Sequence, residues 1–146
     1  MSGDVIGTPG LKALFAGLGP LVRSTKADIV IANGENAQGG FGIGKDEADK
    51  LLAMGVHVIT SGNHVWERQG AAELLEATPR LVRPANYPPG APGKGYAVVE
   101  AGGAAWAVVN LQGREGMSPI DCPFRTADAV LAAIAKQTVV SFTSLG

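Results

Sequence analysis

Apolar runs of strand length alternate with segments of helical period along the first half of the chain. The run over residues 29–32 (IVIA) is continuous, as is typical of a strand covered on both faces. After it, residues 45–55 (KDEADKLLAMG) show helical spacing, and residues 56–61 (VHVITS) form a second apolar run. Strands that alternate with helices in this way pair in parallel, because each helix carries the chain back across the sheet. Further helices are predicted over residues 8–25, capped by Thr8 with Pro9 as the first helical residue, and over residues 67–78.

The second half of the chain has a different pattern. Proline and glycine are frequent in residues 81–95 (LVRPANYPPGAPGKG), which predicts a surface loop. Residues 96–113 (YAVVEAGGAAWAVVNLQG) predict two strands joined at Gly102-Gly103, a pair typical of a tight hairpin. A helix over about residues 127–136 and a strand over residues 138–142 follow. The whole pattern predicts one α/β domain.

Composition narrows the classes of partner. The chain has 146 residues, is 46% hydrophobic and 17% charged, and carries a formal net charge of −1. These values indicate a folded core and give no electrostatic reason to bind bulk nucleic acid. No stretch reaches the roughly eighteen apolar residues that cross a bilayer, so we expect no membrane association and a cytoplasmic location. The single cysteine excludes an internal disulfide and a cysteine-built zinc site.

Three polar turns, each introduced by a glycine, follow the predicted strands or lie at the start of the chain. They place Asp4 after Gly3, Glu35 and Asn36 after Gly34, and Asn63 and His64 after Gly62. Ligands bind at the carboxyl ends of parallel strands, where such turns converge, so we expect these five side chains to share one centre. Carboxylate, amide and imidazole groups bind divalent metals, and a histidine there can be a ligand or a proton donor.

The same turns belong to a longer series of motifs. In order, they are GDVIGTPG, NGENAQGGFGI, SGNHVW, RPANYP, GKG and NLQGR. This series resembles the calcineurin-like metallophosphoesterases, and within them the bacterial YmdB-type branch of 2′,3′-cyclic-nucleotide 2′-phosphodiesterases. The resemblance extends from Asp4 to about Lys136. The tripeptide Asp4-Val5-Ile6 stands where more familiar members carry Asp-x-His, and this departure is shared by the YmdB-type branch.

The resemblance implies a role for each of the five residues. Asp4 matches a ligand of the first metal, Glu35 the bridging carboxylate, and Asn36 and Asn63 ligands of the second metal. His64 matches the proton donor to the leaving ribose oxygen, while a metal-bound hydroxide attacks phosphorus. The expected cofactors are two divalent ions, Fe or Mn, with Zn or Mg as alternatives. The expected substrate is a small phosphodiester or nucleotide, above all a 2′,3′-cyclic nucleotide, and a homo-oligomer is compatible with the sequence.

Two departures from the family limit this expectation. Only Met1-Ser2-Gly3 precede Asp4, so the first strand looks clipped, and family members continue for about as many residues again, supplying further histidine ligands. This chain has only His57 and His64, and His57 lies within an apolar strand, where a structural role is expected. The predicted fold is therefore a partial metallophosphoesterase α/β/β/α sandwich with a mixed sheet. Residues 1–146 would form the N-terminal portion of one domain, without its C-terminal half, and the chain alone would be inactive or weakly active.

Two other classes of function stay open. Residues 39–46 (GGFGIGKD) nearly match a phosphate-binding P-loop, but Asp46 stands where the hydroxyl that binds magnesium is needed. A non-catalytic interaction fragment would use the charged loop NLQGREG, with Arg114 and Glu115, and the loop over residues 84–95 as partner-facing surfaces. In a complete phosphodiesterase these loops would be walls of the active site, with Asn86 or Arg83 near the substrate.

Overall fold

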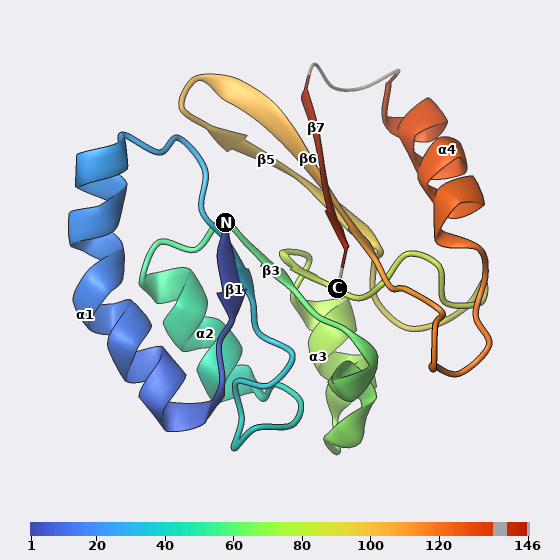
Figure 1. Cartoon of the computed structure of the whole chain (residues 1–146), viewed down its shortest axis with the longest axis horizontal. Helices are drawn as coiled ribbons and strands as arrows, with labels where there is room; N and C mark the ends of the chain where they lie inside the picture. Colours follow the sequence, from blue (N-terminus) through green and yellow to red (C-terminus); the bar gives the residue numbers. More distant parts are fainter. Residues whose placement is uncertain (136–139, 146) are drawn as a thin grey trace.

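The computed structural model describes residues 1–135 and 140–145, arranged as an α/β/β/α sandwich (Figure 1). Three helices cover the outer face of a first sheet, a second sheet packs on its inner face, and a fourth helix covers the second sheet. In chain order the elements are β1 (Ser2–Asp4), α1 (Gly7–Thr25), β2 (Ile31–Asn33), α2 (Lys45–Ala53), β3 (Val58–Thr60), the 3-10 helix η1 (Asn63–Glu67), α3 (Ala71–Ala77), β4 (Leu81–Val82), β5 (Tyr96–Ala101), β6 (Ala104–Leu111), α4 (Pro123–Ile134) and β7 (Val140–Leu145).

The first sheet consists of parallel strands in the order β1-β2-β3-β4. Its two central strands align Ala32 with Ile59 and Asn33 with Thr60. The predicted apolar runs are therefore confirmed as parallel strands, although β2 begins at Ile31 and extends to Asn33. The short first strand is present, since Ser2–Asp4 pairs with β2 and has three residues, as do β2 and β3.

The second sheet is mixed, because β5 and β6 are antiparallel whereas β6 and β7 are parallel. The predicted hairpin is confirmed, and its turn residues Gly102 and Gly103 have φ values of 58° and 77°. Two positive φ values are what a two-residue turn of type I′ needs, so glycine suits both positions. Residues 136, 138 and 139, which end the predicted helix and begin the predicted last strand, lie outside the described residues.

Three apolar clusters fill the three spaces between the layers. The alternation of side chains along β6 explains how one strand serves two of them: Val108 faces the first sheet, while Ala107 and Val109 face α4. The outer cluster joins α1, α2 and α3 to the first sheet through Leu11, Leu18, Leu51, Leu75 and Ile59. The cluster between the sheets contains Ile31, Val58, Val82, Ala97 and Val108, and the last one contains Ala107, Val109, Leu111 and Ile134.

Two helix starts differ from the prediction. α1 begins at Gly7 with Ile6 as its N-cap residue, so Thr8 does not cap it, and Pro20 lies within the helix. The start is set by tertiary contact, because the Gly7 amide donates to the Asn36 carbonyl at 2.9 Å. α4 begins at Pro123, four residues before the predicted start, with proline at its favoured first-turn position. None of the helices in the described ranges is long and apolar enough to cross a membrane.

Asn110 is a buried polar residue of β6 whose hydrogen bonds tie the second sheet to the first. Its side chain is 1% exposed, and Nδ2 donates to the Ser61 carbonyl at 2.6 Å and to the Val82 carbonyl at 3.0 Å. Replacing Asn110 with leucine removes both donors, and we expect the free energy of unfolding to fall by about 1–3 kcal/mol. Urea unfolding, with Gln69→Leu at an exposed position as the control, measures this. Equal values for the two variants would show that the tie does not contribute.

Candidate functional site

The five predicted site residues lie at the carboxyl ends of three neighbouring parallel strands. Asp4 ends β1, Glu35 and Asn36 follow β2 within three residues, and Asn63 and His64 begin η1 after β3. The strands are adjacent in the sheet, which is why turns 27 or more residues apart in the chain meet at one edge. In Figure 1 the labelled strands β1 and β3 of this sheet run toward the bottom of the view.

Asp4 and Asn36 are in direct contact. Asn36 Nδ2 donates to Asp4 Oδ2 at 2.7 Å, while the Asn36 carbonyl accepts the amides of Gly7 and Gly40 at 2.9 and 3.1 Å. These bonds fix both the backbone and the amide plane of Asn36. Its other side-chain atom, Oδ1, is buried and has no hydrogen-bond partner within the described structure. The pair therefore presents one oxygen of each residue that is not used between them.

Glu35 is held in one orientation by its neighbours. Its amide donates to Asn33 Oδ1 at 2.9 Å, and Asn33 Nδ2 donates back to Glu35 Oε1 at 3.4 Å. The second oxygen, Oε2, is buried and unpartnered within the described residues. It lies against the Gly62 backbone so closely that a Cβ on Gly62 would fall 1.8 Å from it. The absence of a side chain at Gly62 therefore allows Glu35 to reach the turn that carries Asn63.

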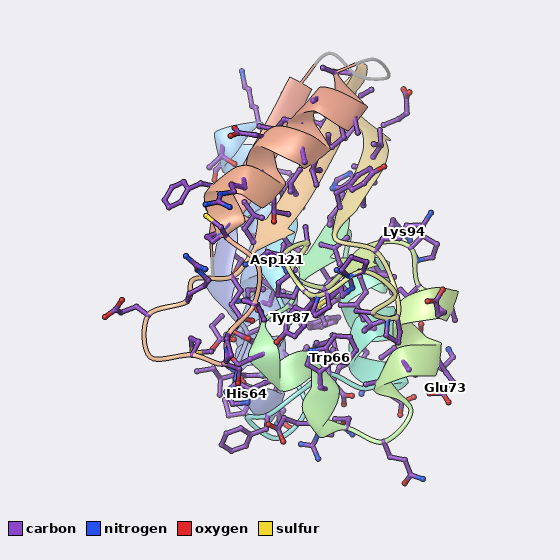
Figure 2. The ribbon with its side chains drawn as sticks, turned by 90° about the vertical axis from the view of Figure 1, so that its right-hand side faces the viewer. His64, Trp66, Glu73, Tyr87, Lys94 and Asp121 are labelled. Atoms are coloured by element: carbon purple, nitrogen blue, oxygen red, sulfur yellow. The ribbon has the colours of Figure 1, made fainter. Side chains whose placement is uncertain are left out.

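His64 follows Asn63 in η1 and has a partly exposed imidazole. Its ring packs edge-on against Phe41, with centroids 5.2 Å apart, and its side chain is 30% exposed. Nδ1 lies 3.9 Å from Glu67 Oε1, which is too long for a hydrogen bond, so this buried nitrogen has no partner among the described atoms. The loop that carries Phe41 is fixed by Arg68, which donates to the carbonyls of Gln38 and Phe41. Figure 2 shows His64 at the lower left of the view.

A cavity of about 370 Å³ opens next to Glu35 and Asn63. One wall consists of these residues with Ser61 and Gly62, and the facing wall is the segment over residues 111–117, including Gln112 and Arg114. The charged loop that sequence reasoning left open as a partner-facing surface thus borders the predicted site. Sequence patterns did not single out Gln112, whose position depends on packing between the two sheets. Asn33 was also missed, although a polar residue at the end of an apolar run was a signal that it faces the site.

Asn86 and Arg83 have structural roles in the described residues. Asn86 Nδ2 donates to the carbonyls of Gln112 and Asp121, and thereby supports the wall of the cavity from behind. The Arg83 guanidinium donates to the carbonyls of Pro84, Ala91 and Pro92, and burial lowers the pKa of this side chain. Neither residue is among those that line the 370 Å³ cavity.

Two other residues weighed in the sequence are used elsewhere. Lys45 begins α2 and pairs with Asp49 one turn along the same helix, which raises the pKa of the lysine. Its ammonium group is therefore directed along the helix, unlike the lysine of a P-loop. His57 Nδ1 accepts the Val30 amide at 3.0 Å, as expected for a structural histidine that ties β3 to the strand beside it.

A model of the YmdB-like protein family matches residues 1–144. The chain belongs to this family. The YmdB-like chain is 41% identical over 140 residues to a 2′,3′-cyclic-nucleotide 2′-phosphodiesterase from Bacillus subtilis (strain 168), a match that covers 96% of this chain and 53% of the relative. Its structure resembles that of a hypothetical protein from Thermus thermophilus, with 38% identity and a TM-score of 0.83, over 99% of this chain and 56% of the other.

A second similar structure is that of a phosphatase. The crystal structure of a novel phosphatase from Mycoplasma pneumoniae has a TM-score of 0.84 to this chain at 27% identity, and covers 98% of this chain and 52% of the phosphatase. The predicted metallophosphoesterase fold is thus confirmed. The YmdB-like chain spans about half the length of the relatives it matches, so the activity of a whole relative is a proposal for this chain.

The oxygens at this edge fit a divalent cation in part. Glu35 Oε2 and Asn36 Oδ1 are both buried and unpartnered within the described structure, which is costly unless a cation or a donor binds them. The described ranges hold no group of three His, Cys, Asp or Glu side chains that could bind a metal ion, so Asp4, Glu35 and His64 do not form such a group. The predicted donors are two carboxylates and two amides, a combination that suits oxygen-preferring divalent ions.

Proposed function

We propose that this chain carries part of the catalytic centre of a metal-dependent phosphodiesterase. Asp4, Glu35, Asn36 and Asn63 would hold divalent cations, two in number by resemblance, with Fe or Mn favoured and Zn or Mg as alternatives. Residues 1–146 would belong to one metallophosphoesterase domain. The observation that carries the proposal is the pair of buried, unpartnered oxygens on Glu35 and Asn36, on adjacent residues and beside the His64 turn.

The substrate class is the finer part of the proposal. A 2′,3′-cyclic nucleotide is favoured because the relative from Bacillus subtilis, 41% identical, is named for hydrolysis of that class. A divalent cation bound here would act as a Lewis acid toward a phosphoryl oxygen. His64 would protonate the leaving ribose oxygen, since it follows the predicted donor Asn63 directly in η1 and its imidazole has a buried nitrogen without a partner among the described residues.

Replacing His64 with glutamine separates proton donation from metal binding. Glutamine keeps a polar side chain of similar length but cannot deliver a proton, so we expect hydrolysis of 2′,3′-cyclic AMP to fall by about 10²–10⁴-fold. The Mn²⁺ affinity should stay within twofold of the parent chain, because the four oxygen donors are untouched. Product formation by chromatography and Mn²⁺ binding by calorimetry give the two readouts.

Three outcomes of this pair of measurements differ in meaning. Turnover that depends on His64, however slow, supports the phosphodiesterase. Tight Mn²⁺ binding with turnover that is the same in the parent chain and in His64→Gln would contradict the role of His64 as proton donor. Absence of Mn²⁺ binding would contradict the proposed centre itself.

A further inference from the structure

The wall that faces the predicted metal donors carries two groups suited to a phosphate. The segment over residues 111–117 closes the 370 Å³ cavity opposite Glu35 and Asn63. Leu111 and Gln112 belong to its buried part, 2% and 4% exposed, whereas Arg114 is exposed. The cavity is therefore rigid at its inner end and accessible at its outer end.

Gln112 is fixed from three sides. Its amide donates to Asn86 Oδ1 at 3.0 Å, its carbonyl accepts Asn86 Nδ2 at 2.9 Å, and its side-chain Oε1 accepts the Tyr87 hydroxyl at 3.3 Å. The Tyr87 ring packs edge-on against Trp66 with centroids 5.4 Å apart, and both side chains lie above His64 in Figure 2. With Oε1 occupied, Nε2 is left as a buried donor that has no partner within the described part of the chain. Because Gln112 lines the cavity, its Nε2 group can donate a hydrogen bond to a ligand bound there.

Arg114 supplies charge to the same cavity. Neither ion pair found among the described residues involves Arg114, so its guanidinium is available to an anion. The planar guanidinium can donate two parallel hydrogen bonds to a phosphate, which a lysine ammonium cannot do. Glu115 also lines the cavity and would repel a phosphate, which makes the positive charge of Arg114 more important for binding.

We propose that Gln112 and Arg114 form the phosphate-binding wall of this cavity. Arg114 takes two non-bridging phosphate oxygens, and Gln112 Nε2 donates one hydrogen bond to an oxygen of the same substrate. The ligand class is a phosphate ester with free non-bridging oxygens, and the assignment rests on the proposed function because it places the substrate between this wall and the donors on Glu35 and Asn63. Neither residue contributes to metal binding.

Calorimetric titration of the full chain with inorganic phosphate, with and without Mn²⁺, tests this wall. We expect Arg114→Gln to raise the dissociation constant for phosphate about 10–100-fold, and Arg114→Lys to raise it less, because one of two parallel bonds is kept. Gln112→Glu keeps the acceptor for Tyr87 but replaces the donor with a negative charge, so it should weaken phosphate binding at least about tenfold. Lys94→Gln is the matched control, since it removes one positive charge from a loop that lies away from His64 (Figure 2). Mn²⁺ affinity should be the same in the Arg114 and Lys94 variants, and the added carboxylate of Gln112→Glu should not weaken it.

The outcomes separate this inference from the proposed function. Equal phosphate affinity in Arg114→Gln and Lys94→Gln, or no phosphate binding by the parent chain, would overturn the phosphate wall while leaving a metal centre that needs Glu35 in place. Phosphate binding that needs Arg114 in a chain that binds no Mn²⁺ would support the wall and overturn the metal-dependent function. Loss of phosphate binding in Gln112→Glu counts for the wall only if its circular dichroism spectrum matches that of the parent chain.

Discussion

Replacing Glu35 with glutamine should weaken Mn²⁺ binding by at least about 100-fold. The change removes a carboxylate whose second oxygen is buried without a partner among the described residues, and replacing even residues that only orient a ligand lowers metal affinity about 10–100-fold. The stability of the metal-free chain should not fall, and should rise slightly, because a buried and unpaired charge is replaced by a neutral amide. Calorimetry for Mn²⁺ and urea unfolding without metal measure the two effects.

The matched control for this change is Glu73→Gln. Glu73 lies in the first turn of α3, and Figure 2 shows it on the opposite side of this view from His64. We expect its replacement to leave Mn²⁺ affinity within twofold of the parent value. Equal Mn²⁺ affinity in the two variants would contradict a role for Glu35 as a metal donor.

Gly62→Ala should produce nearly the same loss of Mn²⁺ binding without changing any donor. A Cβ at this position would lie 1.8 Å from Glu35 Oε2 and 2.7 Å from its Cδ, so the carboxylate must turn away. The backbone of Gly62 is not in the left-handed region, so the effect is steric and not a conformational preference of glycine. We expect a further loss of about 1–3 kcal/mol in the free energy of unfolding, as for other overpacked sites.

Two companion variants test the cause of that effect. Gly17→Ala introduces a Cβ where no atom lies within 4 Å, inside α1, and should leave Mn²⁺ binding unchanged while adding about 0.5–1 kcal/mol of stability. In a Glu35→Ala background the clash no longer exists, so Gly62→Ala should cost little stability there. A full cost in both backgrounds would show that the contact between Gly62 and Glu35 is not the reason.

Short sequence patterns predicted the strands and turns whose conformation depends on neighbouring residues. The continuous run before Asn33 and the glycine pair at residues 102–103 encode a doubly covered strand and a tight turn, and both are present. The start of α1 could not be read in this way, because the Asn36 carbonyl, 29 residues away from Gly7, receives the first amide of the helix. β4 was missed because its two residues lie in a segment dominated by proline and glycine, and pair with β3 only in the folded sheet.

In the candidate site, too, local patterns predicted some residues, and tertiary contacts decided the others. The glycine-led turns indicated Asp4, Glu35, Asn36, Asn63 and His64, and the fold brings these turns to one sheet edge, where Asp4 contacts Asn36 and Glu35 contacts Gly62. The loop NLQGREG was expected to be a wall of the site in a phosphodiesterase, but the position of Gln112 within it could not be predicted, since Asn86 and Tyr87 hold it from a distant loop. Such positions arise from packing between the two sheets, which has no local sequence signature.

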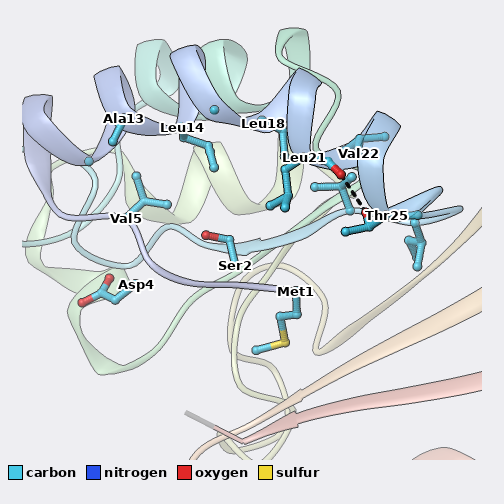
Figure 3. A pocket seen from close by; sticks show the side chains of 15 residues that line it. Met1, Ser2, Asp4, Val5, Ala13, Leu14, Leu18, Leu21, Val22 and Thr25 are labelled. Atoms are coloured by element: carbon cyan, nitrogen blue, oxygen red, sulfur yellow. Dashed lines mark hydrogen bonds between the residues drawn. The ribbon is translucent and has the colours of Figure 1, made fainter.

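A larger apolar groove lies beside β1, the edge strand of the first sheet. This groove, about 780 Å³, runs between α1 and β1 and includes Leu14, Leu18 and Leu21 of the helix (Figure 3). Asp4 lies at the end of this groove, whereas the 370 Å³ cavity is lined by Glu35 and Asn63 and not by Asp4. Changes that fill the groove near Asp4 are therefore expected to affect the donor pair that Asp4 forms with Asn36.

Anomalous scattering from crystals of the full chain grown with Mn²⁺ tests the proposed centre most directly. We predict a manganese peak bounded by the side-chain oxygens of Asp4, Glu35, Asn36 and Asn63, with the His64 imidazole beside it. A peak confined to other carboxylates, or manganese-soaked crystals in which these four side chains turn away from one another, would contradict the metal centre.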